Sequence, residues 1–375
     1  MSLLQPNQLV DAKILIRVPN WVGDAVLCLP ALRALRHALP QTELTLLARP
    51  WVNDVFPAQE LRCRVISYDT RTEHRGVVGR WRMASDLRAE NFQAAILLQN
   101  ALDAAILSML SGIPIRAGYA RQGRGPLLTH PIDVPRPGEI PSHEAHYYLE
   151  MLRRLGLIAP YNEVREISLS ASTEQRTASR KLLQDLLARK TEEDNIAPES
   201  HPVIGISPGA SFGTAKRWPA GSFAQLSQQL QQDLGASCIF FGSAEEKPLV
   251  DSLLASSGPR SISLAGETSL SDFIRLVQGC DLYLTNDTGT MHVAAALGVP
   301  TLALFGPTDE FGTRPLGACA SIAIGEAECR PCKLRHCPID HRCMTSITPQ
   351  MVFASANALL ERATALKIAT ASQVQ

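Results

Sequence analysis

The sequence lacks features that would place it in several large classes of proteins. Its 375 residues contain no apolar run of the roughly 18 residues that a membrane-spanning helix needs. The N-terminus shows no basic stretch followed by an apolar run and a cleavage site, so no signal peptide is predicted and we expect a cytoplasmic protein. The 36 basic and 36 acidic residues cancel and aromatic residues make up only 5%, which argues against a nucleic-acid-binding protein.

Familiar nucleotide-binding motifs are missing as well. The first predicted strand, residues 13–18, is not followed by GxGxxG, which argues against an oxidoreductase that binds NAD. The glycine-rich loop at residues 207–219 lacks the Lys-Ser/Thr ending of a Walker A loop. No DxD-type pair of aspartates stands beside the candidate ligand loops, so no catalytic metal site is predicted.

What the sequence does contain is two successive sets of apolar, β-branched runs that alternate with helical segments. This alternation is typical of parallel sheets covered by helices on both faces. It predicts an α/β protein with two Rossmann-like domains whose parallel sheets face an interdomain cleft, with ligands at the carboxyl ends of the strands. The predicted strands are residues 13–18, 43–48, 64–68, 94–98 and 115–119, then 203–207, 237–241, 261–264, 282–285 and 301–305.

The domain boundaries follow from the same pattern. An N-terminal domain is predicted at 1–170 and a linker at 171–200, which includes one polar helix. A second domain is predicted at 201–348, with a cysteine-rich segment at 329–343, and a C-terminal helix at 349–375.

The loop SPGASFGTAKRWP, residues 207–219, has the composition of a diphosphate-binding loop. Its glycines let the backbone approach a ligand closely. Ser211 and Thr214 offer hydroxyls, Lys216 offers positive charge, and the helix predicted from Pro219 directs its N-terminus at the same region. The alternative is an ordinary glycine-rich turn.

A second loop that could bind an anion, NDTGTMH, follows the predicted strand at 282–285. Asn286 or Asp287 could cap the next helix, while Thr288 and Gly289 would present backbone N–H groups at its N-terminus. His292 lies one turn further on, within reach of a phosphate or a sugar hydroxyl. Alternatively, Asp287 is only a cap and His292 only a half-buried polar residue.

Two carboxylates stand at strand–helix turns. Glu245 or Glu246 could accept hydrogen bonds from ribose hydroxyls, although acidic residues are common at helix starts. Asp24, in NWVGDAV, has uncharged neighbours, so partial desolvation would raise its pKa towards that of a general base. The alternative for Asp24 is a helix-start residue favoured by the helix dipole.

Two further groups of residues are candidates for binding. Arginines are dense in the predicted first domain and could hold an acidic acceptor, or simply form a solvated surface; the candidates are Arg71, Arg75, Arg121 and Arg124. Four cysteines in CRPCKLRHCPIDHRC could close a structural zinc site, pack a loop as reduced thiols, or form a redox-labile disulfide. These cysteines are Cys329, Cys332, Cys337 and Cys343.

Four segments together resemble the ADP-heptose:lipopolysaccharide heptosyltransferases of glycosyltransferase family nine. They are NWVGDAVLCLPALRALRHALP, SPGASFGTAKRWP, FGSAEEK and TNDTGTMHVAAALGVPTLALFGPTD. Their order and spacing carry the resemblance, which covers most of the chain, and the second segment is most similar to the heptosyltransferase II branch.

The resemblance implies a GT-B fold and an inverting transfer of heptose from ADP-heptose to the first heptose of the lipopolysaccharide inner core. It makes Asp24 the catalytic base, Lys216 a contact of the donor phosphates and Glu246 the ligand of the ribose. Asp287, Thr288, Gly289 and His292 match a donor-binding segment, and Ser211 and Thr214 fall in the donor loop.

The resemblance also implies the partners. These are ADP-heptose, Kdo-lipid A bearing one heptose, and the inner face of the cytoplasmic membrane, which the protein would meet peripherally; no nucleic acid is expected. No cofactor is expected for catalysis, and a structural zinc ion would occupy only the cysteine cluster. The alternatives are a heptosyltransferase of type I or III with another core acceptor, or an enzyme that uses another nucleotide sugar.

Overall fold

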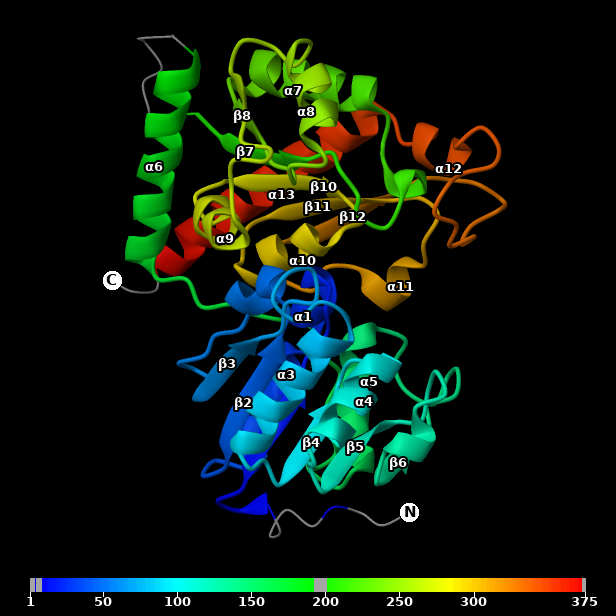
Figure 1. The fold of residues 1–375 in the computed structure, drawn as a ribbon. Helices are drawn as coiled ribbons and strands as arrows, with labels where there is room; N and C mark the ends of the chain where they lie inside the picture. The colour runs from blue at the N-terminus through cyan, green and yellow to red at the C-terminus, as the bar shows by residue number, and fades with distance from the viewer. Residues whose placement is uncertain (1–3, 5–8, 192–200, 373–375) are drawn as a thin grey trace. The chain divides into compact units, whose positions relative to one another are not determined.

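The computed structural model describes residue 4 and residues 9–191 and 201–372 of the chain. The chain divides into two compact units, Met1–Val164 and Arg165–Gln375, and each unit has a sheet of its own with helices on its faces (Figure 1).

The first unit contains a six-stranded parallel sheet in the order β3-β2-β1-β4-β5-β6. Its strands are β1 (Lys13–Arg17), β2 (Glu43–Ala48), β3 (Cys63–Ser67), β4 (Ala94–Leu97), β5 (Ile115–Tyr119) and β6 (His130–Ile132). Its α-helices are α1 (Val22–Leu27), α2 (Leu29–Ala38), α3 (Gly76–Ala89), α4 (Leu102–Leu110) and α5 (Glu144–Arg154).

The second unit repeats this plan, with the order β12-β11-β10-β7-β8-β9, again all parallel. Its strands are β7 (Val203–Ser207), β8 (Ser237–Phe240), β9 (Ser261–Ser263), β10 (Leu282–Asn286), β11 (Thr301–Phe305) and β12 (Ala320–Ile324). Its helices are α6 (Thr173–Thr191), η4 (Thr214–Lys216), α7 (Ala220–Leu234), α8 (Lys247–Leu254), α9 (Leu270–Val277), α10 (Gly289–Ala296), α11 (Glu310–Thr313), α12 (Arg342–Thr345) and α13 (Pro349–Ser372).

Both sheets have the strand order of a Rossmann fold, with the first strand of the unit at the centre. The predicted α/β class and the two Rossmann-like parallel sheets are therefore confirmed. The order reverses between β1 and β4 in the first unit and between β7 and β10 in the second. Loops that leave the carboxyl ends of strands at such a reversal diverge and leave a crevice for a ligand.

Apolar side chains hold each sheet between its helices. In the second unit, Figure 1 shows α7 and α8 on one side of the strands and α9 and α10 on the other. On the first side Leu226 and Leu230 of α7 and Val352 of α13 are buried in one cluster with strand residues such as Leu284. Burying such a side chain stabilises the fold by about 1.5–3 kcal/mol. No helix of the described residues is both long enough and apolar enough to cross a bilayer.

The structure adds elements that the sequence pattern did not predict. Each sheet has a sixth strand at its edge, β6 or β12, beyond the five that were predicted. The helix predicted after the first strand is two helices, α1 and α2, which meet at Cys28. Pro30 explains the break, because proline has no N–H to donate and is accommodated only in the first turn of a new helix.

The segment predicted as a linker also differs. Its first part, α6, packs on α9 and β9 and so belongs to the second unit, which begins at Arg165. Residues 192–200, the rest of that segment, lie outside the described residues.

The end of α7 gives a test of the second unit's stability. Gly235 ends the helix with a φ of 63°, and a Cβ at this position would lie 2.8 Å from His201 Nδ1. We expect Gly235→Ala to lower the free energy of unfolding by about 1–2 kcal/mol, because an L side chain is strained in this backbone conformation. Chemical denaturation of the purified protein measures the change.

The matched control is Gly221→Ala in the first turn of the same helix, where an added Cβ meets nothing within 4 Å. That substitution should leave the stability unchanged or raise it by about 0.5–1 kcal/mol. Equal losses in the two variants would contradict the role given to Gly235.

Candidate functional site

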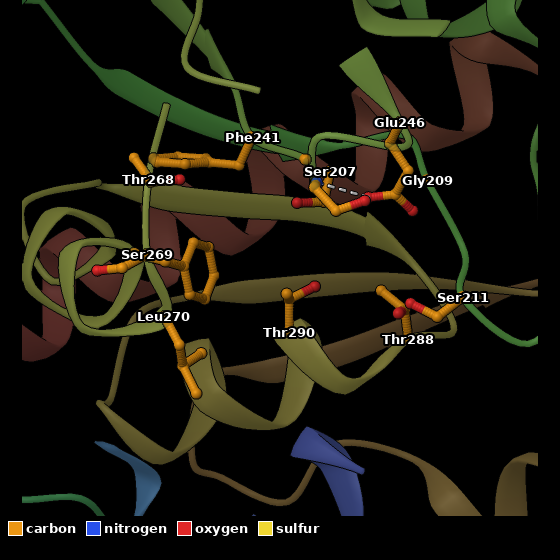
Figure 2. A pocket seen from close by; sticks show the side chains of 13 residues that line it. Ser207, Gly209, Ser211, Phe241, Glu246, Thr268, Ser269, Leu270, Thr288 and Thr290 are labelled. Atoms are coloured by element: carbon orange, nitrogen blue, oxygen red, sulfur yellow. Dashed lines mark hydrogen bonds between the residues drawn. The ribbon is translucent and has the colours of Figure 1, made fainter. Parts of the chain in front are cut away.

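The second unit has a cavity of about 210 Å³ at the carboxyl ends of β7 to β10, where its strand order reverses. Figure 2 shows Phe241 and Leu270 at one end of this cavity, and Ser211 and Thr288 at the other. Phe241 and Leu270 give the first end an apolar surface that suits a ring, next to Thr268 and Ser269, and the other end is polar and suits an oxygen-rich group. Its position agrees with the place where open α/β sheets bind ligands.

Glu246 lies in the wall of this cavity with its carboxylate fixed. The Glu246 Oε2 atom accepts hydrogen bonds from the backbone N of Ser243 (2.9 Å) and from Ser243 Oγ (3.2 Å). A Cβ on Gly209 would lie 1.9 Å from Glu246 Oε1, so this position requires glycine for the carboxylate to come so close to the loop that follows β7. The remaining acceptor sites of the carboxylate suit a pair of hydroxyl groups.

Lys216 and Asp287 form an ion pair, and Asp287 directly precedes Thr288, which lines the polar end of the cavity. The Lys216 Nζ atom lies 2.6 Å from Asp287 Oδ2, and the two side chains are only 14% and 5% exposed. The hydroxyl of Thr308 donates a hydrogen bond to the same carboxylate oxygen (2.5 Å). An ammonium group has three donors, so Lys216 can keep Asp287 and still bind an anion.

This pair changes the role of Asp287. The carboxylate does not cap α10, because the N-cap residue of that helix is Thr288, whose side chain makes no capping hydrogen bond. A bare carboxylate would repel a phosphate, but the charge of Asp287 is paired with the Lys216 ammonium group 2.6 Å away.

Asn286 is a site residue whose role the sequence did not reveal. It is completely buried, and its side-chain oxygen accepts a hydrogen bond from the backbone N of Trp218 (3.0 Å). Its amide nitrogen donates to the carbonyl oxygens of Pro208 (2.8 Å) and Gly209 (3.2 Å). Asn286 thus fastens both ends of the loop at 207–219 to the end of β10. The motif alone could not separate this role from helix capping, because asparagine favours both.

The other predicted donor-binding residues are only partly brought together. Ser211 and Thr288 line the cavity, and Gly289 begins α10 directly after Thr288. His292 is buried on α10 and is not part of the cavity wall. Thr214 does not line the cavity either, and its hydroxyl lies 3.0 Å from His336 Nδ1.

In the first unit, Asp24 lies half-buried in the first turn of α1, which follows β1. Its charge affects Tyr148 of α5 and Cys28. Burial raises the pKa of both side chains well above the usual values, and the nearby Asp24 carboxylate raises these pKa values further. These two neighbours of the Asp24 carboxylate therefore stay neutral at physiological pH.

Three of the four predicted acceptor arginines, Arg71, Arg75 and Arg121, are exposed. Arg124 is completely buried, and its guanidinium group donates to the carbonyl oxygens of Tyr119 (2.8 Å) and Gln99 and to Asn100 Oδ1 (3.0 Å). Burial lowers its pKa to about 10. The prediction that Arg124 binds an acceptor is therefore wrong: it ties together the loops that follow β4 and β5.

The predicted zinc site at the cysteine cluster is not supported. All four cysteines are free thiols, and they line one small cavity of about 70 Å³. Over the part of the chain that the structure describes, no three metal-binding side chains are placed to hold an ion. Burial and the neighbouring thiols raise the pKa of Cys343, which favours its neutral, packed form.

Together, the groups around the cavity of the second unit suit a nucleoside diphosphate. Lys216 and the N-terminus of α10 are placed for an anion, the Glu246 carboxylate can accept hydrogen bonds from hydroxyls, and Phe241 offers an apolar surface to a ring.

Comparison with known proteins also finds relatives, one of which is named for a nucleoside-diphosphate sugar. The chain is 29% identical over 364 residues to lipopolysaccharide heptosyltransferase 2 of Escherichia coli, covering 93% of this chain and 98% of that one. It is 27% identical over 356 residues to lipooligosaccharide heptosyltransferase 2 of Haemophilus influenzae, covering 93% and 99%. The solved structure of E. coli ADP-heptose LPS heptosyltransferase II matches with a TM-score of 0.76 and 26% identity, over 93% of this chain and 99% of that one.

The match to that structure confirms the predicted GT-B fold. The model of glycosyltransferase family 9 (heptosyltransferase) matches residues 80–343, which is well over half of the sequence. The chain is therefore a glycosyltransferase and belongs to glycosyltransferase family 9, the heptosyltransferases.

Proposed function

We propose that this enzyme transfers L-glycero-D-manno-heptose from ADP-heptose to the first heptose of the lipopolysaccharide inner core, with inversion at the anomeric carbon. The observation that carries the proposal is the Lys216–Asp287 pair beside a cavity that also contains a fixed carboxylate, Glu246. The similarity to heptosyltransferases 2 over 93% of the chain supports this donor and this acceptor over those of other family members.

The donor is held by its ADP part. The diphosphate binds to Lys216 and to the N-terminus of α10 at Thr288 and Gly289, where backbone N–H groups and the helix dipole favour negative charge. Glu246 accepts hydrogen bonds from the ribose hydroxyls, and the adenine lies at the apolar end of the cavity beside Phe241. Ser211 adds a hydroxyl on the phosphate side.

The chemical step is a single displacement. Asp24 removes the proton from the attacking hydroxyl of the acceptor, the new glycosidic bond forms, and the bond to the diphosphate breaks. ADP leaves with the electron pair, and Lys216 and the N-terminus of α10 meet the charge that develops on it. Because protein groups meet this charge, we propose that transfer requires no cofactor.

The acceptor is Kdo-lipid A that carries one heptose, and its acidic groups are expected to meet Arg71, Arg75 and Arg121. Such an acceptor is anchored in a membrane, so we propose that the enzyme works in the cytoplasm and meets the inner face of the cytoplasmic membrane peripherally. The exposed guanidinium groups suit this acceptor because arginine binds carboxylates and phosphates through two hydrogen bonds.

A direct assay tests the function. Purified enzyme is incubated with ADP-heptose and truncated core glycolipids that carry no heptose, one heptose or two heptoses. We expect ADP release and a product one heptose heavier, seen by mass spectrometry, only with the one-heptose acceptor. Preference for the heptose-free acceptor would indicate a type I enzyme, and turnover of a different nucleotide sugar would refute the proposed donor.

The role of Lys216 is tested by Lys216→Ala. We expect the affinity for ADP, measured by calorimetry, to fall about 10- to 100-fold, because a hydrogen bond to a charged group contributes about 1.5–3 kcal/mol. Lys13→Ala removes the same charge from an exposed pair in the first unit and should leave ADP binding unchanged. Unchanged affinity in Lys216→Ala would remove this lysine from the phosphate site.

Asp24 is tested by Asp24→Asn and Asp24→Ala. Loss of a general base lowers the rate of transfer by about 10²- to 10⁴-fold. The affinity for ADP should stay within about twofold of the wild-type value, because the donor contacts lie in the second unit. If either variant turned over at a near-normal rate, Asp24 could not be the base.

A further inference from the structure

The cysteine segment, residues 329–343, packs against the loop that carries Lys216. The backbone N of Ala215, the residue before Lys216, donates a hydrogen bond to the carbonyl oxygen of Arg335 (3.0 Å). The carbonyl oxygen of Ala215 lies 2.6 Å from His341 Nε2. Both backbone polar groups of Ala215 are thus bound by the cysteine segment, which fixes the peptide from which the lysine projects.

The contact sets the hydrogen-bonding role of His341 Nε2. A carbonyl oxygen can only accept a hydrogen bond, so the Nε2–H group of His341 donates one to the carbonyl oxygen of Ala215. The backbone of His341 has a φ of 60°, in the left-handed region that few residues other than glycine adopt. Residues held in such a conformation often serve a functional arrangement, and here it directs the imidazole at the lysine loop.

The same segment also reaches the other side of the Lys216–Asp287 pair. The backbone N of Lys333 donates to the carbonyl oxygen of Pro307 (2.8 Å), and the Arg330 guanidinium pairs with Glu310 (2.9 Å). These contacts hold the loop after β11, whose Thr308 donates to Asp287. The cysteine segment therefore connects the loop of the lysine with the loop that orients its partner carboxylate.

The approach of the segment to the lysine loop is very close. A Cβ on Gly213 would lie 2.3 Å from the carbonyl oxygen of Arg335. Beneath this contact, Ala215 lines the same cavity of about 70 Å³ as the four thiols. The small apolar cysteines thus form the packed base on which the segment meets the loop.

We propose that the cysteine segment positions Lys216 for the diphosphate of the donor, and that His341 is its main positioning residue. The proposal rests on the proposed function, because it assigns a support to the phosphate-binding lysine of that site. His341 does not touch the donor: it acts through the carbonyl group of Ala215, and its loss lets the lysine loop move relative to Asp287 and α10.

The experiment compares two substitutions of the histidine. His341→Asn tolerates the left-handed backbone but is too short to reach Ala215, whereas His341→Gln places an N–H near the position of Nε2. We expect His341→Asn to weaken ADP binding about fivefold to tenfold by calorimetry and to raise the donor KM more than it lowers kcat. His341→Gln should restore most of the affinity.

Two further measurements separate positioning from general stability. Adenosine has no phosphate, so its affinity should be the same in His341→Asn and the wild type. In a Lys216→Ala background, His341→Asn should have no further effect on ADP binding, because the two residues act through one contact. Asp340→Asn is the matched control: it removes an exposed pair with Arg342 on the same segment and should leave ADP binding unchanged.

The outcomes distinguish this inference from the proposed function. If the wild type binds ADP, and Lys216→Ala weakens this binding, but His341→Asn binds ADP normally, the positioning role is refuted and the function stands. Equal losses of ADP and adenosine affinity, or additive losses in the double variant, would also refute it. If the wild type does not bind ADP at all, the proposed function itself fails.

Discussion

The candidate site depends on one ion pair that is mostly shielded from solvent, between Lys216 and Asp287. Burying two charges costs several kcal/mol per ion, and the pair offsets this cost only if further hydrogen bonds satisfy its atoms. The hydroxyl of Thr308 provides one such bond to the carboxylate. Each partner also sits on a loop that leaves the carboxyl end of a parallel strand, so the Rossmann order of β7 and β10 is what brings the two side chains together.

The surrounding structure keeps that geometry fixed. Asn286, at the end of β10, binds both ends of the loop at 207–219, while Glu246 comes close to the same loop only because residue 209 is glycine. The loop that carries Ser211 and Lys216 is therefore held at both ends by hydrogen bonds between its backbone and the side chain of Asn286. Preorganised charges of this kind stabilise a leaving diphosphate without the cost of rearranging at the moment of reaction.

Much of the fold could be predicted from the sequence, because buried parallel strands are continuous apolar runs, as in β1 and β7, and chemistry-bearing residues follow them directly. The edge strands β6 and β12 could not be predicted from the sequence. β6 has three residues, one of them Pro131, and every residue of β12 is only half-buried, so neither produces a clear apolar signal. The same limit applies to the site. Loop composition indicated an anion, but the burial of Arg124 and the pairing of Thr214 with His336 depend on contacts between distant parts of the chain.

The carboxylate beside Lys216 has a consequence for the catalytic cycle. In the proposed cycle, the Lys216 ammonium group is not left unpaired when the nucleotide departs, because Asp287 lies 2.6 Å from it in the structure. In the proposed site, donor binding adds an anion to an existing Lys216–Asp287 pair and does not supply the first partner of an unpaired ammonium group. Within the proposed cycle, this pairing limits how tightly the ADP product is bound, which favours its release before the next turnover.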